Sequence, residues 1–345
     1  MRKRLLATVL QVVTGLLACS SGFAQVISAG ALHSMGICTD STVMTWGYNS
    51  DGQLGNGTYS ASNLPIAVPG MTQVIAVAGG YGHSLALQHD GTVWAWGRNS
   101  VGMLGDGTNI EHTSPVQVIG LSGVKRIAAG RYHSLAVKSD GTVWGWGAGM
   151  YGELGNGSSG ADFVPVQSPW LTGVIAVAGG FSYSLALKND GTVWAFGANN
   201  SGQFGNGSTT DSAIPVQIVS LSSIVGIAAG FGFSLVLRDD GTVWAFGYNG
   251  SGQLGNGTTV TSTVPVQVSG LTDVIAIEVG EHHSLAIRED GTVWAWGRNS
   301  SGELGDGTTT NRSLPVQVVA LNGAKACAAG VRHTLVLKND GTLWA

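Results

Sequence analysis

One sequence unit of 50 residues recurs along the chain, and this fixed period constrains the fold more than any other feature. Its clearest mark is a tryptophan, which stands at Trp94, Trp144, Trp194, Trp244 and Trp294. A proline returns with the same spacing, at Pro65, Pro115, Pro165, Pro215, Pro265 and Pro315. A period of this size is typical of a repeat architecture, in which each unit buries its apolar face only against its neighbours.

Each unit has the pattern of a small antiparallel β-sheet. In the unit that begins at Val74, alternating apolar residues predict strands over residues 74–78, 83–88, 92–97 and 115–118. The Asp90-Gly91 pair predicts a hairpin turn, and the leading Pro115 suits an edge strand. Four such strands, repeated radially, describe a propeller blade. A right-handed β-helix is the alternative, but its coils are usually shorter and do not need a hairpin in every turn.

The units begin near residues 26, 74, 124, 174, 224, 274 and 324. Six are complete, and the seventh stops at Ala345 inside its third strand. We therefore expect an all-β fold with a truncated last blade, and we expect the natural reading frame to continue or the gene to be damaged. No segment of the repeats has helical periodicity.

The first 24 residues differ from the repeats. Arg2, Lys3 and Arg4 precede an apolar run, and small residues follow before Gln25. This is the pattern of a secretory signal peptide, which is too short for a comfortable membrane span. We predict a signal peptide over residues 1–24, a propeller over 25–345, and a periplasmic, extracellular or cell-surface protein. A second interpretation makes Cys19 the anchor residue of a bacterial lipoprotein.

The charge and the cysteine content of the chain limit the classes of partner and ligand that we expect. Cleavage removes three of the 16 Lys+Arg residues, which leaves 13 against 20 acidic residues and a net charge of about −7. An acidic chain with scattered cations argues against nucleic acid as a partner. Cys38 and Cys327 occupy a polar and an apolar repeat position, so we expect neither a bridge between them nor a metal site. We expect no cofactor and a monomer.

Three strings carry a family resemblance: His-Ser-Leu-Ala-Leu, Asp-Gly-Thr-Val-Trp, and Gly-Gln-Leu-Gly-Asn-Gly-Thr, which stands at 52–58 and 252–258. From Val26 to Ala345 the chain resembles the regulator of chromosome condensation repeat family. The resemblance implies a seven-bladed β-propeller of four-stranded antiparallel blades. It also suggests a guanine nucleotide exchange factor, but the signal peptide and the lack of a protruding segment argue against that role. A secreted β-lactamase inhibitor protein of similar architecture suggests enzyme inhibition as another alternative.

Two columns of the repeat invite catalytic or metal-binding interpretations. A histidine recurs at His33, His83, His133, His283 and His333, with Tyr183 and Phe233 in the other two units. Equivalent positions on packed sheets lie about 10 Å apart, too far for a shared metal, so we expect packing and loop bracing. Each histidine precedes a serine or threonine, but adjacent strand residues point to opposite faces and cannot form a nucleophile–base pair. We predict no enzymatic activity.

The remaining columns have structural explanations. The Asp-Gly pairs fit turn geometry, and calcium at Asp106 and Asp306 is disfavoured because other units carry Asn there. The first tryptophan column is expected to pack between blades. A Lys/Arg column that includes Lys138 and Arg288 is expected to form a solvated rim, because each cation has an acidic residue close by.

Sequence variation between units is concentrated in the loop between the first and second strands. That loop contributes Tyr81, Arg131, Tyr132, Phe181 and Phe231. The loop after the third strand emerges on the same face and adds Tyr48, Tyr151 and Tyr248. Trp170 stands where other units have a small residue, on the opposite face, as a second anchor or a plug. Exposed Tyr, Phe and Arg are typical of interface hot spots. We therefore predict a non-catalytic scaffold that binds a protein partner; neutral drift in exposed loops and a lectin-like module are the alternatives.

Overall fold

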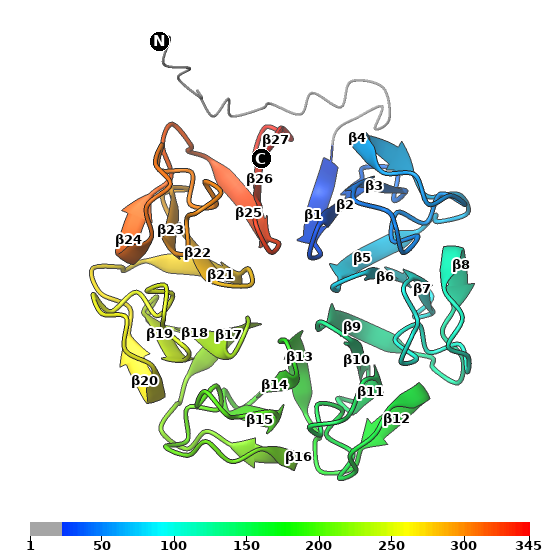
Figure 1. Cartoon of the computed structure of the whole chain (residues 1–345), viewed down its shortest axis with the longest axis horizontal. Helices are drawn as coiled ribbons and strands as arrows, with labels where there is room; N and C mark the ends of the chain where they lie inside the picture. Colours follow the sequence, from blue (N-terminus) through cyan, green and yellow to red (C-terminus); the bar gives the residue numbers. More distant parts are fainter. Residues whose placement is uncertain (1–22) are drawn as a thin grey trace, which may run out of the picture.

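The computed structural model describes residues 23–345, which form a ring of seven antiparallel β-sheets around a central channel (Figure 1). Six sheets have four strands and the last has three. We call the sheets blades 1 to 7 in chain order. Within each blade the strands are ordered as in the chain, from the channel outwards (Figure 1). The predicted all-β, seven-bladed propeller with an incomplete last blade is confirmed.

The innermost strands are β1 (Phe23–Ala29), β5 (Val74–Gly79), β9 (Val124–Ala129), β13 (Val174–Gly179), β17 (Ile224–Ala229), β21 (Val274–Val279) and β25 (Ala324–Ala329). The second strands are β2 (His33–Cys38), β6 (His83–Gln88), β10 (His133–Lys138), β14 (Tyr183–Lys188), β18 (Phe233–Arg238), β22 (His283–Arg288) and β26 (Thr334–Lys338). The third strands are β3 (Val43–Gly47), β7 (Val93–Gly97), β11 (Val143–Gly147), β15 (Val193–Gly197), β19 (Val243–Gly247), β23 (Val293–Gly297) and β27 (Leu343–Trp344). The outer strands are β4 (Ser62–Ala67), β8 (His112–Gln117), β12 (Asp162–Ser168), β16 (Ser212–Gln217), β20 (Ser262–Gln267) and β24 (Arg312–Gln317).

The Asp-Gly pair closes the hairpin between the second and third strands, as predicted. In blade 2, Asp90 Oδ1 accepts hydrogen bonds from the backbone N–H and the hydroxyl of Thr92, at 2.9 and 2.7 Å. Gly91 has a φ of +83°, which a residue with a Cβ adopts only at a cost. The turn places Leu87 opposite Val93 and so sets the register of the hairpin.

The outer strand differs from the prediction. It begins at His112 in blade 2, three residues before Pro115, so the proline lies within the strand and does not lead it. An outer strand has a hydrogen-bonded neighbour on one side only, and proline is tolerated where its missing N–H would face outward. The sequence pattern therefore identified the strand but placed its start too late.

The core lies between the blades and rests on the second aromatic column. Trp96, Trp146, Phe196, Phe246 and Trp296 are completely buried, whereas Trp94 in the first column is only half-buried. The indole N–H of Trp96 donates to the carbonyl of Gln53 in the preceding blade, at 2.8 Å. A Cβ on Gly55 would stand 2.7 Å from Trp96 Nε1, so close packing requires glycine at that position. Trp94 and Trp144 pack, partly buried, against apolar clusters that join neighbouring blades, so the expected interblade packing of the first tryptophan column is confirmed.

The first tryptophan column also supports the Lys/Arg column. The Lys138 ammonium lies 5.4 Å from the ring centroid of Trp144, and the Arg238 guanidinium lies 4.9 Å from that of Trp244. In blade 6 the cation is Arg288, which pairs with Asp273 at 3.0 Å and Asp290 at 3.8 Å. The nearby acidic residues were expected; the stacking on tryptophan was not.

Blade 7 closes the ring by packing directly against blade 1. The backbone N–H of Val331 donates to the carbonyl of Ala31 at 3.1 Å. Ile27 and Met44 of blade 1 share one apolar cluster with Leu335 and Leu343 of blade 7. Similar backbone bonds join the other neighbouring blades around the channel, such as Arg131 N–H to the carbonyl of Gly180 at 3.0 Å. Within residues 23–345, closure therefore depends on packing and backbone hydrogen bonds between blades 7 and 1.

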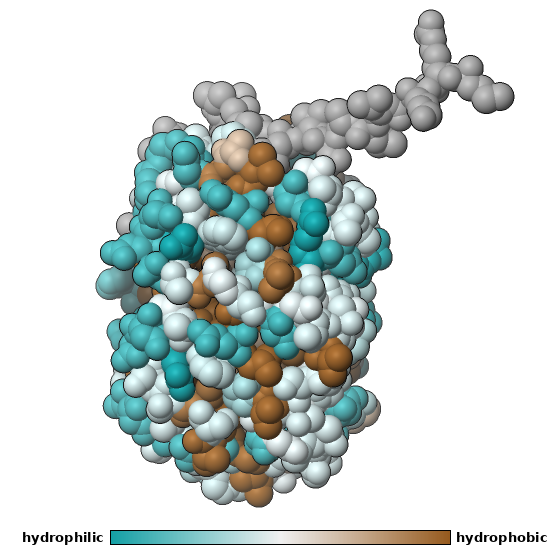
Figure 2. All heavy atoms as spheres, turned by 90° about the vertical axis from the view of Figure 1, so that its left-hand side faces the viewer, coloured by the Kyte–Doolittle hydropathy of each residue, from teal (hydrophilic) through white to brown (hydrophobic). Residues whose placement is uncertain are grey.

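The outside of the ring mixes polar and apolar side chains (Figure 2). The exposed large apolar residues of the outer strands are Leu64, Phe163, Val164, Ile214, Val264 and Leu314. Cys327 is a buried free thiol, so the absence of a bridge between it and Cys38 is confirmed. In residues 23–345 no helix is long and apolar enough to cross a membrane. The predicted signal peptide lies outside the described residues up to residue 22, as does the lipid anchor at Cys19; β1 begins at Phe23, two residues before the predicted cleavage site.

Candidate protein-binding face

One face of the ring carries both kinds of variable loop. Directly after the third strand, the N–H of Arg98 donates to the carbonyl of Gly82 in the first loop of the same blade, at 2.8 Å. The N–H of Ala148 makes the same bond to Tyr132 at 2.8 Å. The two loops therefore emerge together, as predicted from strand order. We call this side the loop face and the side with the Asp-Gly hairpins the turn face.

Six of the predicted binding residues meet in one cluster at the channel mouth of the loop face. The rings of Tyr81 and Tyr132 lie 5.7 Å apart, and those of Phe181 and Phe231 lie 4.3 Å apart in an edge-to-face arrangement. His282 extends the cluster, with its ring 4.9 Å from Phe231 and 5.9 Å from Tyr248. The aromatic cluster comprises Tyr81, Arg98, Arg131, Tyr132, Phe181, Phe231, Tyr248 and His282. It joins blades 2 to 6 across sequence separations of 50 residues and more.

Arg131 is the centre of the aromatic cluster. Its guanidinium carbon lies 4.0 Å from the ring centroid of Phe181, 4.4 Å from that of Tyr81 and 5.0 Å from that of Tyr132. The buried Nε of Arg131 has no hydrogen-bond partner among the described residues. Arg98 adds a second cation, 5.5 Å from the ring of Tyr132. The cations are held by aromatic faces and not by acids, which leaves their positive charge available to a partner.

The other three predicted residues lie apart from this cluster. Tyr48 and Tyr151 are exposed on the loop face, 47% and 45% of their surface being accessible, and neither makes a ring contact with the cluster. Trp170 follows β12, whose last residue Ser168 pairs with Val143 at the turn-face end of β11. Its ring lies against Gly157, where a Cβ would stand 2.4 Å from Cη2. Trp170 therefore covers a loop of its own blade, away from the aromatic cluster.

The histidine column braces neighbouring blades, as predicted. His33 Nε2 lies 2.9 Å from the hydroxyl of Ser84 in the next blade, and His133 Nε2 lies 2.9 Å from that of Ser184. His333 returns to Ser34 of blade 1 at 3.1 Å. Tyr183 takes the histidine position in blade 4 and bonds Ser234 at 2.9 Å. These bonds join neighbouring blades at the start of the second strands, directly after the first loops of the loop face.

The direction of the serine proton rules out an activated nucleophile at this network. The hydroxyl of Ser84 donates to the carbonyl of Gln53 at 2.8 Å, so its oxygen can only accept from His33. Nε2 of His33 must then carry a hydrogen, which it donates to Ser84. Burial, reinforced by neighbouring histidines, lowers the pKa of His33 and of His83 to about 3. A general base would have to accept the hydroxyl hydrogen, and here the hydroxyl has already donated it elsewhere.

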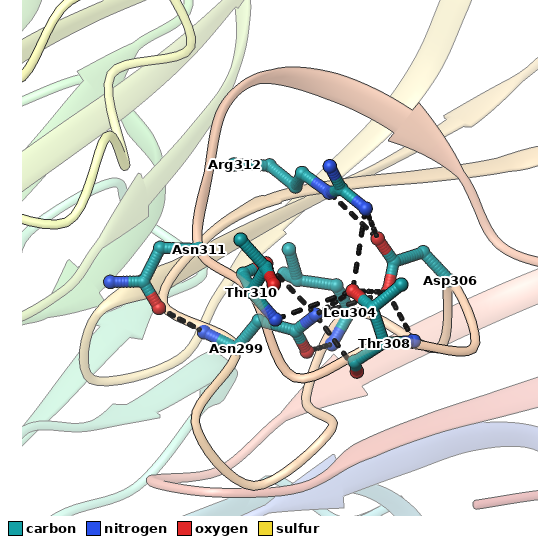
Figure 3. A network of polar contacts seen from close by, with 7 residues as sticks. All are labelled: Asn299, Leu304, Asp306, Thr308, Thr310, Asn311 and Arg312. Carbon is teal, nitrogen blue, oxygen red and sulfur yellow. Dashed lines mark hydrogen bonds and ion pairs between the residues drawn. The ribbon is translucent and has the colours of Figure 1, made fainter.

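The long loop between the third and outer strands is held by one buried asparagine (Figure 3). In blade 6, Asn299 Oδ1 accepts the N–H of Leu304 at 3.0 Å, and its Nδ2 donates to the carbonyls of Thr308 and Thr310, both at 3.1 Å. Asp306 accepts from Thr308 and forms an ion pair with Arg312 at 2.7 Å (Figure 3). Because most of the loop is polar, these hydrogen bonds fix its conformation, and they hold its tip on the loop face.

The same bonds explain Asp106 and Asp306 without a metal. Asp106 accepts from the N–H and hydroxyl of Thr108 and pairs with His112 at 3.1 Å. No group of three or more potential metal-binding side chains occurs among residues 23–345.

Glu278 is a channel residue that the loop pattern does not single out. The central channel has a volume of about 440 Å³ and is lined by the inner strands of all seven blades. At the position of Glu278 the other blades have Ser28, Ala78, Ala128, Ala178, Ala228 and Ala328. Its side chain is exposed to the channel, and desolvation by the surrounding channel walls raises its pKa to about 7. An alignment of the seven copies would have revealed the lone acid at this position.

Comparison with known protein families identifies the same 50-residue repeats. The model described as "Regulator of chromosome condensation (RCC1) repeat" matches six consecutive segments, residues 40–87, 90–137, 140–187, 190–237, 240–287 and 290–337. The chain belongs to this repeat family. A second model of the RCC1 repeat matches six segments from residues 25–53 to 274–303. Each RCC1 match in the first set begins at the aspartate of a hairpin turn, so one sequence repeat spans the outer half of a blade and the inner half of the next.

Solved structures share the RCC1-type fold. The crystal structure of human WBSCR16 has 26% sequence identity and a TM-score of 0.82, over 92% of this chain and 88% of that chain. Prp20p from Saccharomyces cerevisiae has 23% identity and a TM-score of 0.79, over 91% of this chain and 83% of that chain. Yeast RCC1 (Prp20) in complex with Kap60 has 22% identity and a TM-score of 0.75, over 92% and 78%. No significant sequence match is found among curated proteins.

Proposed function

We propose that this RCC1-repeat propeller is a non-catalytic scaffold that binds a protein partner through the aromatic cluster of its loop face. The observation that carries the proposal is the placement of Arg131 between the rings of Tyr81, Tyr132 and Phe181, from three successive blades. Tyrosine and arginine are over-represented among interface hot spots, and side chains already ordered in the free protein lose little entropy on binding.

The charge of the aromatic cluster favours a partner with exposed carboxylates. Arg98 and Arg131 stack on rings and have no acidic partner within hydrogen-bond distance among the described residues, although the chain as a whole has a net charge of −4. A carboxylate that approaches Arg131 would form charge-assisted hydrogen bonds while its neighbours contact the rings. Among the similar structures, Prp20p is a protein with binding properties to Gsp1p and histones, which supports protein binding as a use of this architecture.

A capture experiment tests the face assignment. The purified protein is immobilised and exposed to extracellular and envelope fractions of cells that express it, and retained proteins are identified by mass spectrometry. Changing Tyr81, Tyr132, Phe181 and Phe231 together to Ser should abolish capture while circular dichroism stays unchanged. The matched control changes Tyr48, Tyr59 and Tyr151 to Ser, which removes exposed rings outside the aromatic cluster. Capture retained by the first variant, or lost in the control, contradicts the assignment.

Export is part of the proposal, because the partner must share the protein's compartment. The basic start and apolar run of residues 2–18 support it. Cell fractionation should find the protein outside the cytoplasm, and N-terminal sequencing should find a chain that begins at Gln25. A cytoplasmic chain that begins at Met1 would contradict export.

A further inference from the structure

We propose that the central channel binds a small organic ammonium group, which pairs with the carboxylate of Glu278. The channel is a preformed cavity of about 440 Å³, and Glu278 is the one charged residue at its level in the seven inner strands. A concave site whose walls carry apolar side chains and one convergent charged group is a common form of small-ligand site. This inference concerns the channel lumen and does not depend on the protein partner proposed above.

The carboxylate of Glu278 lacks a counter-ion in the described part of the chain. The backbone N–H of Val279 interacts with it, and none of the ion pairs in residues 23–345 includes it. The side chain is exposed to the channel, so a cation that enters the channel can pair with the carboxylate directly. The group is therefore predisposed to bind positive charge.

The charged and titratable groups around Glu278 come from several elements. Cys327 on β25 is close enough for the Glu278 charge to contribute to the raised pKa of its buried thiol. Glu281 and Arg131 line the same channel at the loop-face mouth, while β17 carries no titratable side chain. On β22, His283 is buried in the interblade network and Arg288 lies at the turn-face end, where it pairs with Asp290. Arg131 is already stacked on aromatic rings.

The lining of the channel favours an alkylammonium over a metal ion. A hard cation such as Ca²⁺ needs six or more oxygen ligands, and one carboxylate among alanines does not supply them. An alkyl chain can instead lie against the small apolar side chains of the wall. On its way in, the ammonium group passes Phe231, which lines the mouth, is not stacked with Arg131 and can offer a cation–π contact.

Calorimetric titration of the full chain with n-hexylamine tests the proposal, with hexan-1-ol as the uncharged probe of equal length. At pH 8 we expect one hexylamine per chain and no binding of hexan-1-ol. At pH 6 the affinity should fall roughly tenfold, because one unit below its pKa a carboxyl is only about one-tenth ionised. The absence of hexylamine binding, or equal binding of the alcohol, would overturn the proposal.

Variants locate the site. Glu278→Ala gives blade 6 the residue that Ala78 and Ala178 already provide in other blades, so folding should be retained; it should lower the affinity for hexylamine at least tenfold. Glu281→Gln, at the mouth, serves as the matched control and should change the affinity less than threefold. Conversely, Ala178→Glu should add a second equivalent of hexylamine. Unchanged binding in Glu278→Ala would refute the assignment of the site to Glu278.

Discussion

The Nε2 atom of His83 lies 3.1 Å from the hydroxyl oxygen of Ser134, which belongs to the next blade. Ser134 in turn donates to the carbonyl of Met103 at 2.9 Å, so a single serine connects a strand of one blade to the long loop and the histidine of another. Both side chains are completely buried. This relationship recurs around most of the ring, and it makes the stability of the propeller depend on neutral histidines.

Acid should therefore weaken the fold. Burial lowers the pKa of His33, His83 and His283 to about 3, and that of His133 and His333 to about 4, from about 6.5 in the unfolded chain. The unfolded chain binds more protons, so the stabilisation is complete above pH 6.5 and is lost as the pH falls towards 3. Each histidine contributes a slope of up to about 1.4 kcal/mol per pH unit. Urea unfolding, monitored by tryptophan fluorescence at several pH values between 7.5 and 5, measures this slope.

His83→Phe separates this effect from other titrations, because Phe233 already fills the equivalent position in blade 5. In the variant, the slope of the unfolding free energy against pH should correspond to the uptake of one proton fewer on unfolding. His89→Gln, at an exposed position, is the control and should leave the slope as it is. A slope that His83→Phe does not change would contradict the burial argument.

Ser134→Ala should lower the free energy of unfolding by more than Ser284→Ala does. The first change leaves both His83 and the Met103 carbonyl without their partner, and each buried unsatisfied group costs about 1–3 kcal/mol. Ser284 faces Phe233 and donates only to the carbonyl of Gln253, at 2.9 Å, so one group is left unsatisfied there. Chemical denaturation of the two variants gives the comparison, and equal losses would show that the histidine bond adds nothing.

Asn299→Ala should release the long loop of blade 6. Three backbone groups lose their partner together, and each one that stays buried and unsatisfied costs about 1–3 kcal/mol, so the loss should exceed that of a single bond unless the loop rearranges to meet water. Limited proteolysis should cut between residues 299 and 311 in the variant faster than in the parent. Asn311→Ala, which removes a single bond to the Asn299 backbone at 2.8 Å, is the milder control.

Gly149 holds the asparagine position in blade 3, and Gly149→Asn should not repair that loop. A Cβ at residue 149 would stand 1.9 Å from the carbonyl oxygen of Gly160, which has moved into the space that asparagine fills elsewhere. We expect a lower melting temperature, measured by differential scanning calorimetry. A higher melting temperature would show that the loop can adopt the conformation of its neighbours.

Glu278→Ala should stabilise the ligand-free protein more at pH 8 than at pH 5. The folded-state pKa of about 7 lies above the unfolded value of 4.5, so the contribution of this group is fully present below pH 4.5 and is lost as the pH rises through 7. Removing the carboxyl removes that loss. Melting temperatures of parent and variant at the two pH values test the sign, and a difference that shrinks from pH 5 to pH 8 would contradict it.

Much of the candidate site could be predicted from sequence because its loops differ while the framework repeats. Tyr81, Arg131, Tyr132, Phe181 and Phe231 were identified as variable positions beside invariant strands, and they meet in the structure. Tyr48 and Tyr151 share their face but not their contacts. Arg98 and Tyr248, by contrast, reach the aromatic cluster from the repeat position of Tyr48 in their own blades. His282 and Arg98 joined the cluster only through contacts between blades.

The sequence by itself determined the repeat and the second and third strands with their Asp-Gly hairpins, since alternation and turn chemistry act within about ten residues. Only the tertiary structure decided which residues meet 50 positions apart. Ring closure set Ser134 against His83, placed Arg131 among three rings, and enclosed Glu278 in a channel where the equivalent positions are almost all alanine. Such contacts depend on how whole sheets pack against one another, and no local pattern encodes that geometry.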